Sequence, residues 1–223
     1  MVLQQAIEVG CTAELRAGDI AAIMRGQFVP QLVAGIPLLE LRAQLSTPRK
    51  PRTANNPLSF QIAPIDLPGE NQIAFLSGIA SALGEHRPGN VVAAFVDEKS
   101  LRNAGDVCEF AADLALPIVY VELGKHRSRV ASRSALKIPV ISVDEADVVA
   151  AYRVAFESIE KARRGAGPTI IRGIACAPQF RERSRHSHFE PDDAVLRMEQ
   201  YLASRNLWTR ELRTQIESAF ARE

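Results

Sequence analysis

Val91-Val92-Ala93-Ala94-Phe95-Val96 is followed by Asp97-Glu98-Lys99-Ser100, by a helical segment to Leu116, and by Pro117-Ile118-Val119-Tyr120-Val121-Glu122. This order of an apolar run, a polar break, a helix and a second apolar run predicts a strand–helix–strand unit. Neither run alternates strictly between apolar and polar residues, which is typical of strands buried on both faces of a parallel sheet. Because such sheets bind ligands at the carboxyl ends of their strands, Asp97 stands where a functional acid is expected.

The rest of the chain extends this alternation in both directions. The first 45 residues read as helical, with Asp19 as the cap of a helix that runs through Met24. Residues 46–68 hold five prolines and predict an irregular loop. Further strands are expected at 138–143 and 169–175, and residues 191–223 predict two C-terminal helices. We therefore expect one domain over 1–223 with a three-layer α/β fold, in which helices flank a mostly parallel sheet.

Composition excludes several classes of protein. Hydrophobic residues make up 47% of the 223 residues and charged residues 24%, as in ordinary globular proteins. A net charge of +1 favours neither nucleic acid nor a membrane surface, and no apolar run approaches the ~20 residues of a membrane span. The first residues lack the basic and apolar regions of a secretory signal. The three cysteines fit neither zinc-binding spacing nor a disulfide framework, so we expect a cytoplasmic protein.

Segments outside the central unit carry a family resemblance. The order of segments resembles the α subunit of the decarboxylating first component of 2-oxo acid dehydrogenase complexes. The resemblance implies a thiamine-diphosphate-binding (transketolase-like) fold, oxidative decarboxylation of a 2-oxo acid, and assembly as a homodimer or as a heterotetramer with a β subunit. The matching segments are Gln5–Gly10, Ala34–Leu41, Ser142–Tyr152, Gly165–Ile174 and Met198–Trp208.

The cofactor motif of that family is incomplete in this sequence. In the family the first strand ends in Gly-Asp-Gly and the second in Asn-Asn, and the Asp and an Asn hold the magnesium ion that binds the cofactor's diphosphate. Here the first motif reads Val96-Asp97-Glu98, and Leu123-Gly124 takes the place of the asparagines. The resemblance therefore implies that Asp97 is a metal and cofactor ligand, but the losses predict weak or lost binding of thiamine diphosphate and magnesium. The alternative is that Asp97 only caps a turn.

Two more positions match residues that face the cofactor or the substrate in the family. Arg25, in Met24-Arg25-Gly26-Gln27, aligns with the family's Tyr-Arg-x-His, which implies that Arg25 contacts the cofactor phosphates. Gln27 then replaces the histidine. His186 matches the family's active-site loop, which implies a catalytic role towards the substrate and the lipoyl arm. The alternatives are a surface arginine and a solvated loop.

Basic residues follow the second strand directly. Arginine and lysine at the end of a parallel strand predict an anion-binding surface. A solvated basic face is the alternative. The residues of this predicted anion site are Lys125, Arg127, Arg129 and Arg133.

Three functions remain open from the sequence. The first is a diverged α subunit that keeps its fold and contacts but binds the cofactor weakly or not at all. The second is a functional enzyme half that a β subunit completes, and the third is an anion- or nucleotide-binding module on the same scaffold. The helix expected at 69–85 carries many small residues, which favours a close subunit contact; those singled out for a homodimer are Ala74, Ser77, Gly78 and Ser81.

Overall fold

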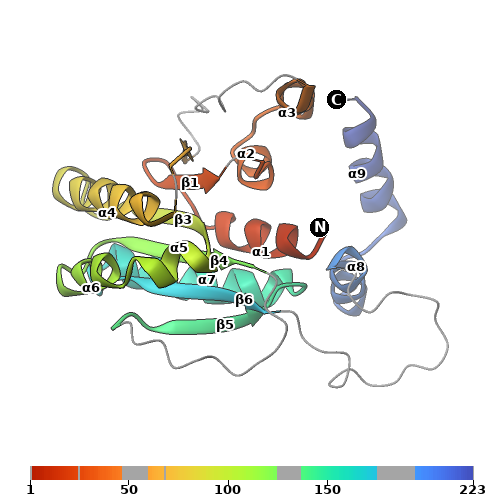
Figure 1. The fold of residues 1–223 in the computed structure, drawn as a ribbon. Coiled ribbons are helices and arrows are strands. Elements are labelled where there is room, and N and C mark those ends of the chain that lie inside the picture. Colours follow the sequence, from red (N-terminus) through yellow and green to blue (C-terminus); the bar gives the residue numbers. More distant parts are fainter. Residues whose placement is uncertain are drawn as a thin grey trace.

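The described residues form a parallel sheet between two layers of helices (Figure 1). The computed structural model describes residues 2–24, 26–46, 60–67, 69–124, 137–174 and 194–222. Within these ranges the sheet has six strands in the order β2-β1-β3-β4-β6-β5, and every neighbouring pair is parallel. The three-layer α/β architecture expected from the sequence is therefore confirmed.

Strands and helices alternate along much of the chain, as the apolar runs of its central part predicted. The strands are β1 (Ile20–Met24), β2 (Gln61–Ile65), β3 (Val92–Asp97), β4 (Ile118–Leu123), β5 (Val140–Asp144) and β6 (Thr169–Ile174). The helices are α1 (Val2–Thr12), α2 (Val29–Val33), α3 (Leu38–Ser46), α4 (Gly69–His86), α5 (Glu98–Asn103), α6 (Gly105–Asp113), α7 (Val148–Arg163), α8 (Ala194–Ser204) and α9 (Arg210–Arg222).

The sheet buries both of its faces, and β3 shows why its sequence does not alternate. Ala93 and Phe95 point into one hydrophobic cluster, which α1 and α7 cover. Val92, Ala94 and Val96 point into the other, which α4, α5 and α6 cover. Because both directions are apolar, every residue of the strand except its last is fully buried. Helix α8 packs against α1 and α7 at the side of the molecule away from α4 and α6 (Figure 1).

Two expectations for the N-terminal part are wrong. Ile20–Met24 is strand β1 and not a helix capped by Asp19, and Gln61–Ile65 within the predicted loop is strand β2. Residues 20–24 take up a strand because β2 and β3 pair with them on either side, which local periodicity cannot reveal. Strand β2 tolerates Pro64 because it lies at the edge of the sheet.

The other expected elements are confirmed with one break. The helix expected after Val96 consists of α5 and α6, which meet at Ala104, where the backbone leaves helical geometry (φ −108°, ψ 35°). The C-terminal region contains α8 and α9, as predicted. Within the described ranges, no helix combines the length and the apolar character that crossing a membrane requires.

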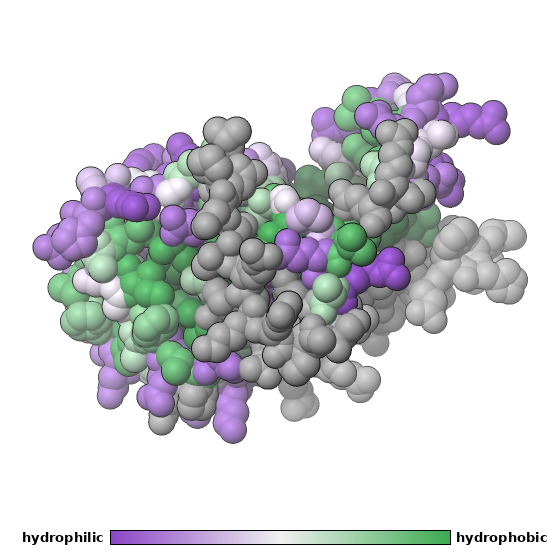
Figure 2. Space-filling view, turned by 90° about the horizontal axis from the view of Figure 1, so that it is seen from above, coloured by the Kyte–Doolittle hydropathy of each residue, from purple (hydrophilic) through white to green (hydrophobic). Residues whose placement is uncertain are grey.

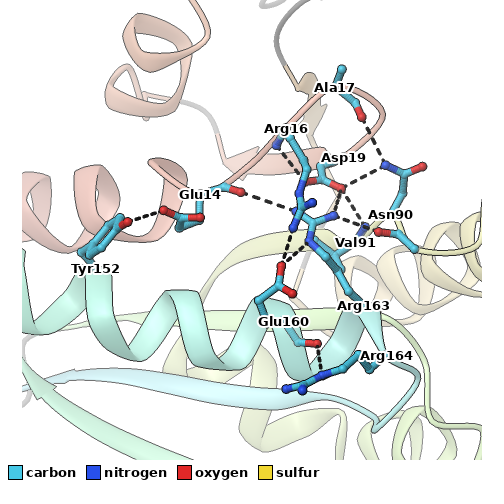
Figure 3. A network of polar contacts seen from close by, with 11 residues as sticks. Glu14, Arg16, Ala17, Asp19, Asn90, Val91, Tyr152, Glu160, Arg163 and Arg164 are labelled. Atoms are coloured by element: carbon cyan, nitrogen blue, oxygen red, sulfur yellow. Dashed lines mark hydrogen bonds and ion pairs between the residues drawn. The ribbon is translucent and has the colours of Figure 1, made fainter.

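A buried ion pair joins the amino ends of β1 and β3 to the last turn of α7 (Figure 3). The Asp19 side chain is fully buried and accepts hydrogen bonds from the Val91 amide at 3.0 Å and the Arg16 amide at 2.9 Å. The Arg163 guanidinium binds the same carboxylate through Nη1 at 2.9 Å and Nη2 at 2.5 Å. It also donates to the Gly89 carbonyl at 2.9 Å. Asp19 is therefore a structural anchor, on the side of the sheet opposite to the strand ends that bind ligands.

Candidate functional site

The candidate site lies at the carboxyl ends of β1, β3 and β4, where parallel sheets bind ligands. Strand β1 ends at Met24, and Asp97 at the end of β3 lies beside Leu123 at the end of β4 in the register of the sheet. Helix α5 starts immediately after β3, at Glu98. The fold therefore places Asp97 where the sequence predicted a functional acid.

Both oxygens of the Asp97 carboxylate are engaged by Ser100. Oδ1 accepts from the Ser100 amide at 2.9 Å, and Oδ2 accepts from the Ser100 hydroxyl at 2.6 Å. Asp97 has extended backbone angles (φ −87°, ψ 156°) and is the N-cap of α5. Partial burial raises the pKa of Asp97, but the hydrogen bonds from Ser100 and from backbone amides outweigh it, and the net pKa is lowered. The carboxylate is thus anionic and already bound within its own turn.

The neighbours of Asp97 add no further metal ligand. Glu98, which replaces the second glycine of the family motif, forms an ion pair with Arg102 one turn along α5. Leu123 is buried and apolar. Among the described residues, no group of three or more His, Cys, Asp or Glu side chains could hold a metal ion. The described part of this edge therefore does not fit a magnesium-bound diphosphate.

Gln27 closes the turn after β1. Its side-chain oxygen accepts from the Met24 amide at 2.8 Å, and its backbone carbonyl accepts from the Gln31 side chain at 2.9 Å. Both glutamines are buried. The residue that stands in place of the family's histidine thus points into its own turn, where its hydrogen bonds stabilise the start of α2.

Glu122 forms a buried ion pair across two neighbouring strands. Its Oε2 accepts from Nε of Arg172 at 2.8 Å, and the two residues are opposite each other in β4 and β6. The Glu122 side chain is 1% exposed and that of Arg172 18%. This pair joins the carboxyl halves of the strands, so Glu122 has a structural role beside the candidate site.

The other residues predicted for the site lie outside the described residues. This applies to the predicted phosphate contact Arg25, to the predicted catalytic His186, and to the predicted anion site of Lys125, Arg127, Arg129 and Arg133. Of the whole predicted set, Asp97 is the residue that the structure positions. The structure agrees with the alternative that Asp97 caps a turn, and it identifies Ser100 as the partner, which the spacing Asp-x-x-Ser at the start of a helix could have indicated.

Helix α4, the predicted contact helix, exposes part of its small-residue face. Ala74 is exposed, and a side chain added at Gly78 would meet open space. Phe75 beside them is 50% exposed, and apolar side chains gather on the side of the molecule where α4 lies (Figure 2). Ser77, however, points inward and hydrogen-bonds the Ile73 carbonyl and the Tyr120 hydroxyl. Ser77 is therefore a core residue and not a surface contact.

Sequence comparison finds relatives over most of the chain. The chain is 27% identical to the 3-methyl-2-oxobutanoate dehydrogenase subunit alpha of Mycobacterium tuberculosis, over 96% of this chain and 64% of that protein. It is also 27% identical to the pyruvate dehydrogenase E1 component subunit alpha of Acholeplasma laidlawii, over 72% of this chain and 54% of that protein. The chain thus spans roughly half to two thirds of the length of these curated relatives.

Comparison with family models and solved structures adds little beyond these relatives. No model of a known protein family matches the chain. A solved structure described as a thiamin diphosphate-dependent enzyme from Mycobacterium smegmatis superposes with a TM-score of 0.49 at 14% identity, covering 78% of this chain and 32% of that one. The sequence relatives match the family that the motifs resemble: over most of its length the chain is similar, at 27% identity, to α subunits of 2-oxo acid dehydrogenases.

Proposed function

We propose that this chain is a diverged α-subunit-like protein that keeps the fold and subunit contacts of its relatives but does not bind thiamine diphosphate by itself. The observation that carries the proposal is the Asp97 carboxylate, whose two oxygens are both hydrogen-bonded to Ser100. These hydrogen bonds account for the position of Asp97 as the cap of α5, although each oxygen keeps a second lone pair. The motif around it supplies no glycine for close approach to a diphosphate and no asparagine as a second ligand.

The first prediction concerns cofactor binding. In isothermal titration calorimetry with magnesium, the isolated chain should show no saturable binding of thiamine diphosphate tighter than roughly 100 μM, because a missing metal ligand costs at least the ~10–100-fold of a missing supporting group. The titration is repeated after adding a candidate β subunit. A micromolar isotherm for the isolated chain would contradict the proposal, and one that appears only with the β subunit would favour a functional enzyme half.

Two Asp97 variants provide the control. Asp97→Ala should lower the free energy of unfolding by about 1 kcal/mol, because it removes the cap of α5, whereas Asp97→Asn should stay close to the parent, because asparagine caps equally well. Urea denaturation measures both. If Asp97 instead served a metal site, Asp97→Asn would abolish magnesium-dependent stabilisation that the parent protein shows.

The second prediction concerns assembly. We propose that the chain forms a homodimer, or a heterotetramer when a β subunit is present, through the exposed face of α4. Phe75 and the open space over Gly78 support this contact. Phe75→Glu should convert the dimer to a monomer in light scattering at tens of micromolar, because a charge at a buried contact has no partner. The matched variant Glu85→Gln, exposed near the end of the same helix, should leave the dimer intact. A monomeric parent protein would contradict the proposal.

We also propose a cytoplasmic location. Cys11 and Cys108 are free buried thiols, which supports a reducing compartment.

A further inference from the structure

A cavity lies between the first turns of α7 and helix α8, away from the candidate site at β1, β3 and β4. Its volume is about 270 Å³. Apolar side chains from both helices and from the loop before α7 form much of its wall, among them Ala146, Val149 and Met198. The polar groups in the wall are those of Asp147, Arg153, Arg197 and Tyr201.

Two of the polar groups belong to one ion-pair cluster. Arg197 binds Asp144 at 2.7 Å and lies 3.8 Å from Oδ2 of Asp147. Oδ1 of Asp147 accepts from the Ala150 amide at 2.9 Å and caps α7. One cation shared by two carboxylates leaves a formal negative charge on this side of the cavity, so an anionic ligand would bind on the side of Arg153.

The other two polar groups remain available. Within the described part of the chain, neither the Arg153 guanidinium nor the Tyr201 hydroxyl has a hydrogen-bond or ion-pair partner. Arg205 lies over the Tyr201 ring, 5.1 Å from its centroid, which leaves the hydroxyl unoccupied. The cavity thus combines an exposed guanidinium and a hydroxyl, neither of them paired within the described part of the chain, with a wall that is partly apolar.

These features select a ligand by size and charge. The volume lies just below the roughly 300–1,000 Å³ of pockets that hold drug-sized ligands, which favours a small ligand. A carboxylate matches the Arg153 guanidinium, to which it can make two parallel hydrogen bonds. An apolar body attached to that carboxylate would cover Val149 and Met198.

We propose that the cavity between α7 and α8 binds a small monocarboxylate with an apolar body, held by Arg153 and Tyr201. The guanidinium of Arg153 binds the carboxylate, the Tyr201 hydroxyl donates a hydrogen bond to it, and the apolar side chains of the wall contact the remainder of the ligand. The proposal is independent of whether the candidate site at β1, β3 and β4 binds a cofactor.

The test uses phenylacetate and its neutral analogue phenylacetamide as probes, titrated into the full-length ¹⁵N-labelled protein and followed by NMR. Phenylacetate should saturate with a Kd of about 1 mM or lower and shift amide signals of α7 and α8. Phenylacetamide should bind at least about tenfold more weakly, because it cannot form the charge-assisted pair. No saturation of phenylacetate up to about 10 mM, or equal affinity for the acid and the amide, would overturn the proposal.

Variants locate the binding groups. Arg153→Gln should lower the affinity for phenylacetate about tenfold and remove the preference for the acid over the amide. Arg164→Gln, exposed at the other end of α7, should change neither the affinity nor the preference. Tyr201→Phe should lower the affinity for phenylacetate by a smaller factor. Val149→Phe fills the cavity and should remove binding of both probes while the circular dichroism spectrum is retained. Unchanged affinity in Arg153→Gln or in Val149→Phe would refute the assignment.

Discussion

Replacing Asp19 by alanine should lower the free energy of unfolding by about 3–5 kcal/mol, the largest effect expected for a single substitution in this chain. The side chains of Asp19 and Arg163 are 0% and 7% exposed, so the substitution leaves a buried guanidinium without its counter-charge. It also removes the acceptor of the Val91 and Arg16 amides, which holds the amino ends of β1 and β3 together. Urea denaturation followed by circular dichroism measures the change.

An exposed ion pair of similar geometry is the matched control. Arg213 and Glu217 on α9 are 2.9 Å apart and 60% and 64% exposed. Because water solvates such charges, Arg213→Ala should leave the free energy of unfolding nearly unchanged. A loss below about 1 kcal/mol in Asp19→Ala would show that the buried pair contributes no more than a surface pair, against the structural role assigned to it.

Replacing Glu8 by glutamine should stabilise the protein at pH 8. Glu8 on α1 is 6% exposed, and burial raises its pKa from 4.5 to about 7. Between these values the folded protein retains a proton that the unfolded chain has released, so the free energy of unfolding falls as pH rises from about 4.5 to about 7. At 1.36 kcal/mol per pKa unit, the loss at pH 8 is on the order of 3 kcal/mol at most. Glutamine carries no charge and avoids this loss.

The pH dependence distinguishes this effect from a change in packing. Below pH 4.5 Glu8 is protonated in both states, so Glu8→Gln and the parent protein should have nearly equal stability there and diverge by roughly 1–3 kcal/mol at pH 8. Glu157→Gln, exposed on α7, should show no such divergence. Thermal unfolding at several pH values measures both variants, and a constant difference across pH would contradict the buried-carboxylate explanation.

The strand–helix–strand unit at 91–122 was predictable because its information is local. Six consecutive apolar residues, three of them valines, end at Asp97 and are followed by a helix and a second apolar run, and this order predicts a strand buried on both faces. The same holds for α7, whose apolar face is visible in the sequence, although only the structure selects Asp147 over Asp144 as its cap. The relationship to 2-oxo acid dehydrogenase α subunits was also predictable, because it rests on the order of sequence segments.

Strands β1 and β2 were not predictable in the same way. Ile20–Met24 is only five residues long, and a run that short fits a helix as well as a strand. Its pairing with β2 depends on residues about 40 positions further on, and tertiary hydrogen bonds override local preference. The prediction of a loop over 46–68 was wrong at 61–65. Proline is excluded from central strands, but Pro64 is tolerated because β2 lies at the edge of the sheet.

The sequence by itself determined that the chain has buried parallel strands, that it is related to the 2-oxo acid dehydrogenase α subunits, and that its cofactor motif lacks glycines and asparagines. Only the tertiary structure showed the hydrogen bonds from Ser100 by which Asp97 caps α5, because the sequence alone is compatible with a helix cap and with a metal ligand. Only the tertiary structure paired Asp19 with Arg163, 144 residues apart, and opened the cavity between α7 and α8. Contacts between distant segments depend on how the helices pack on the sheet, and no local pattern encodes that packing.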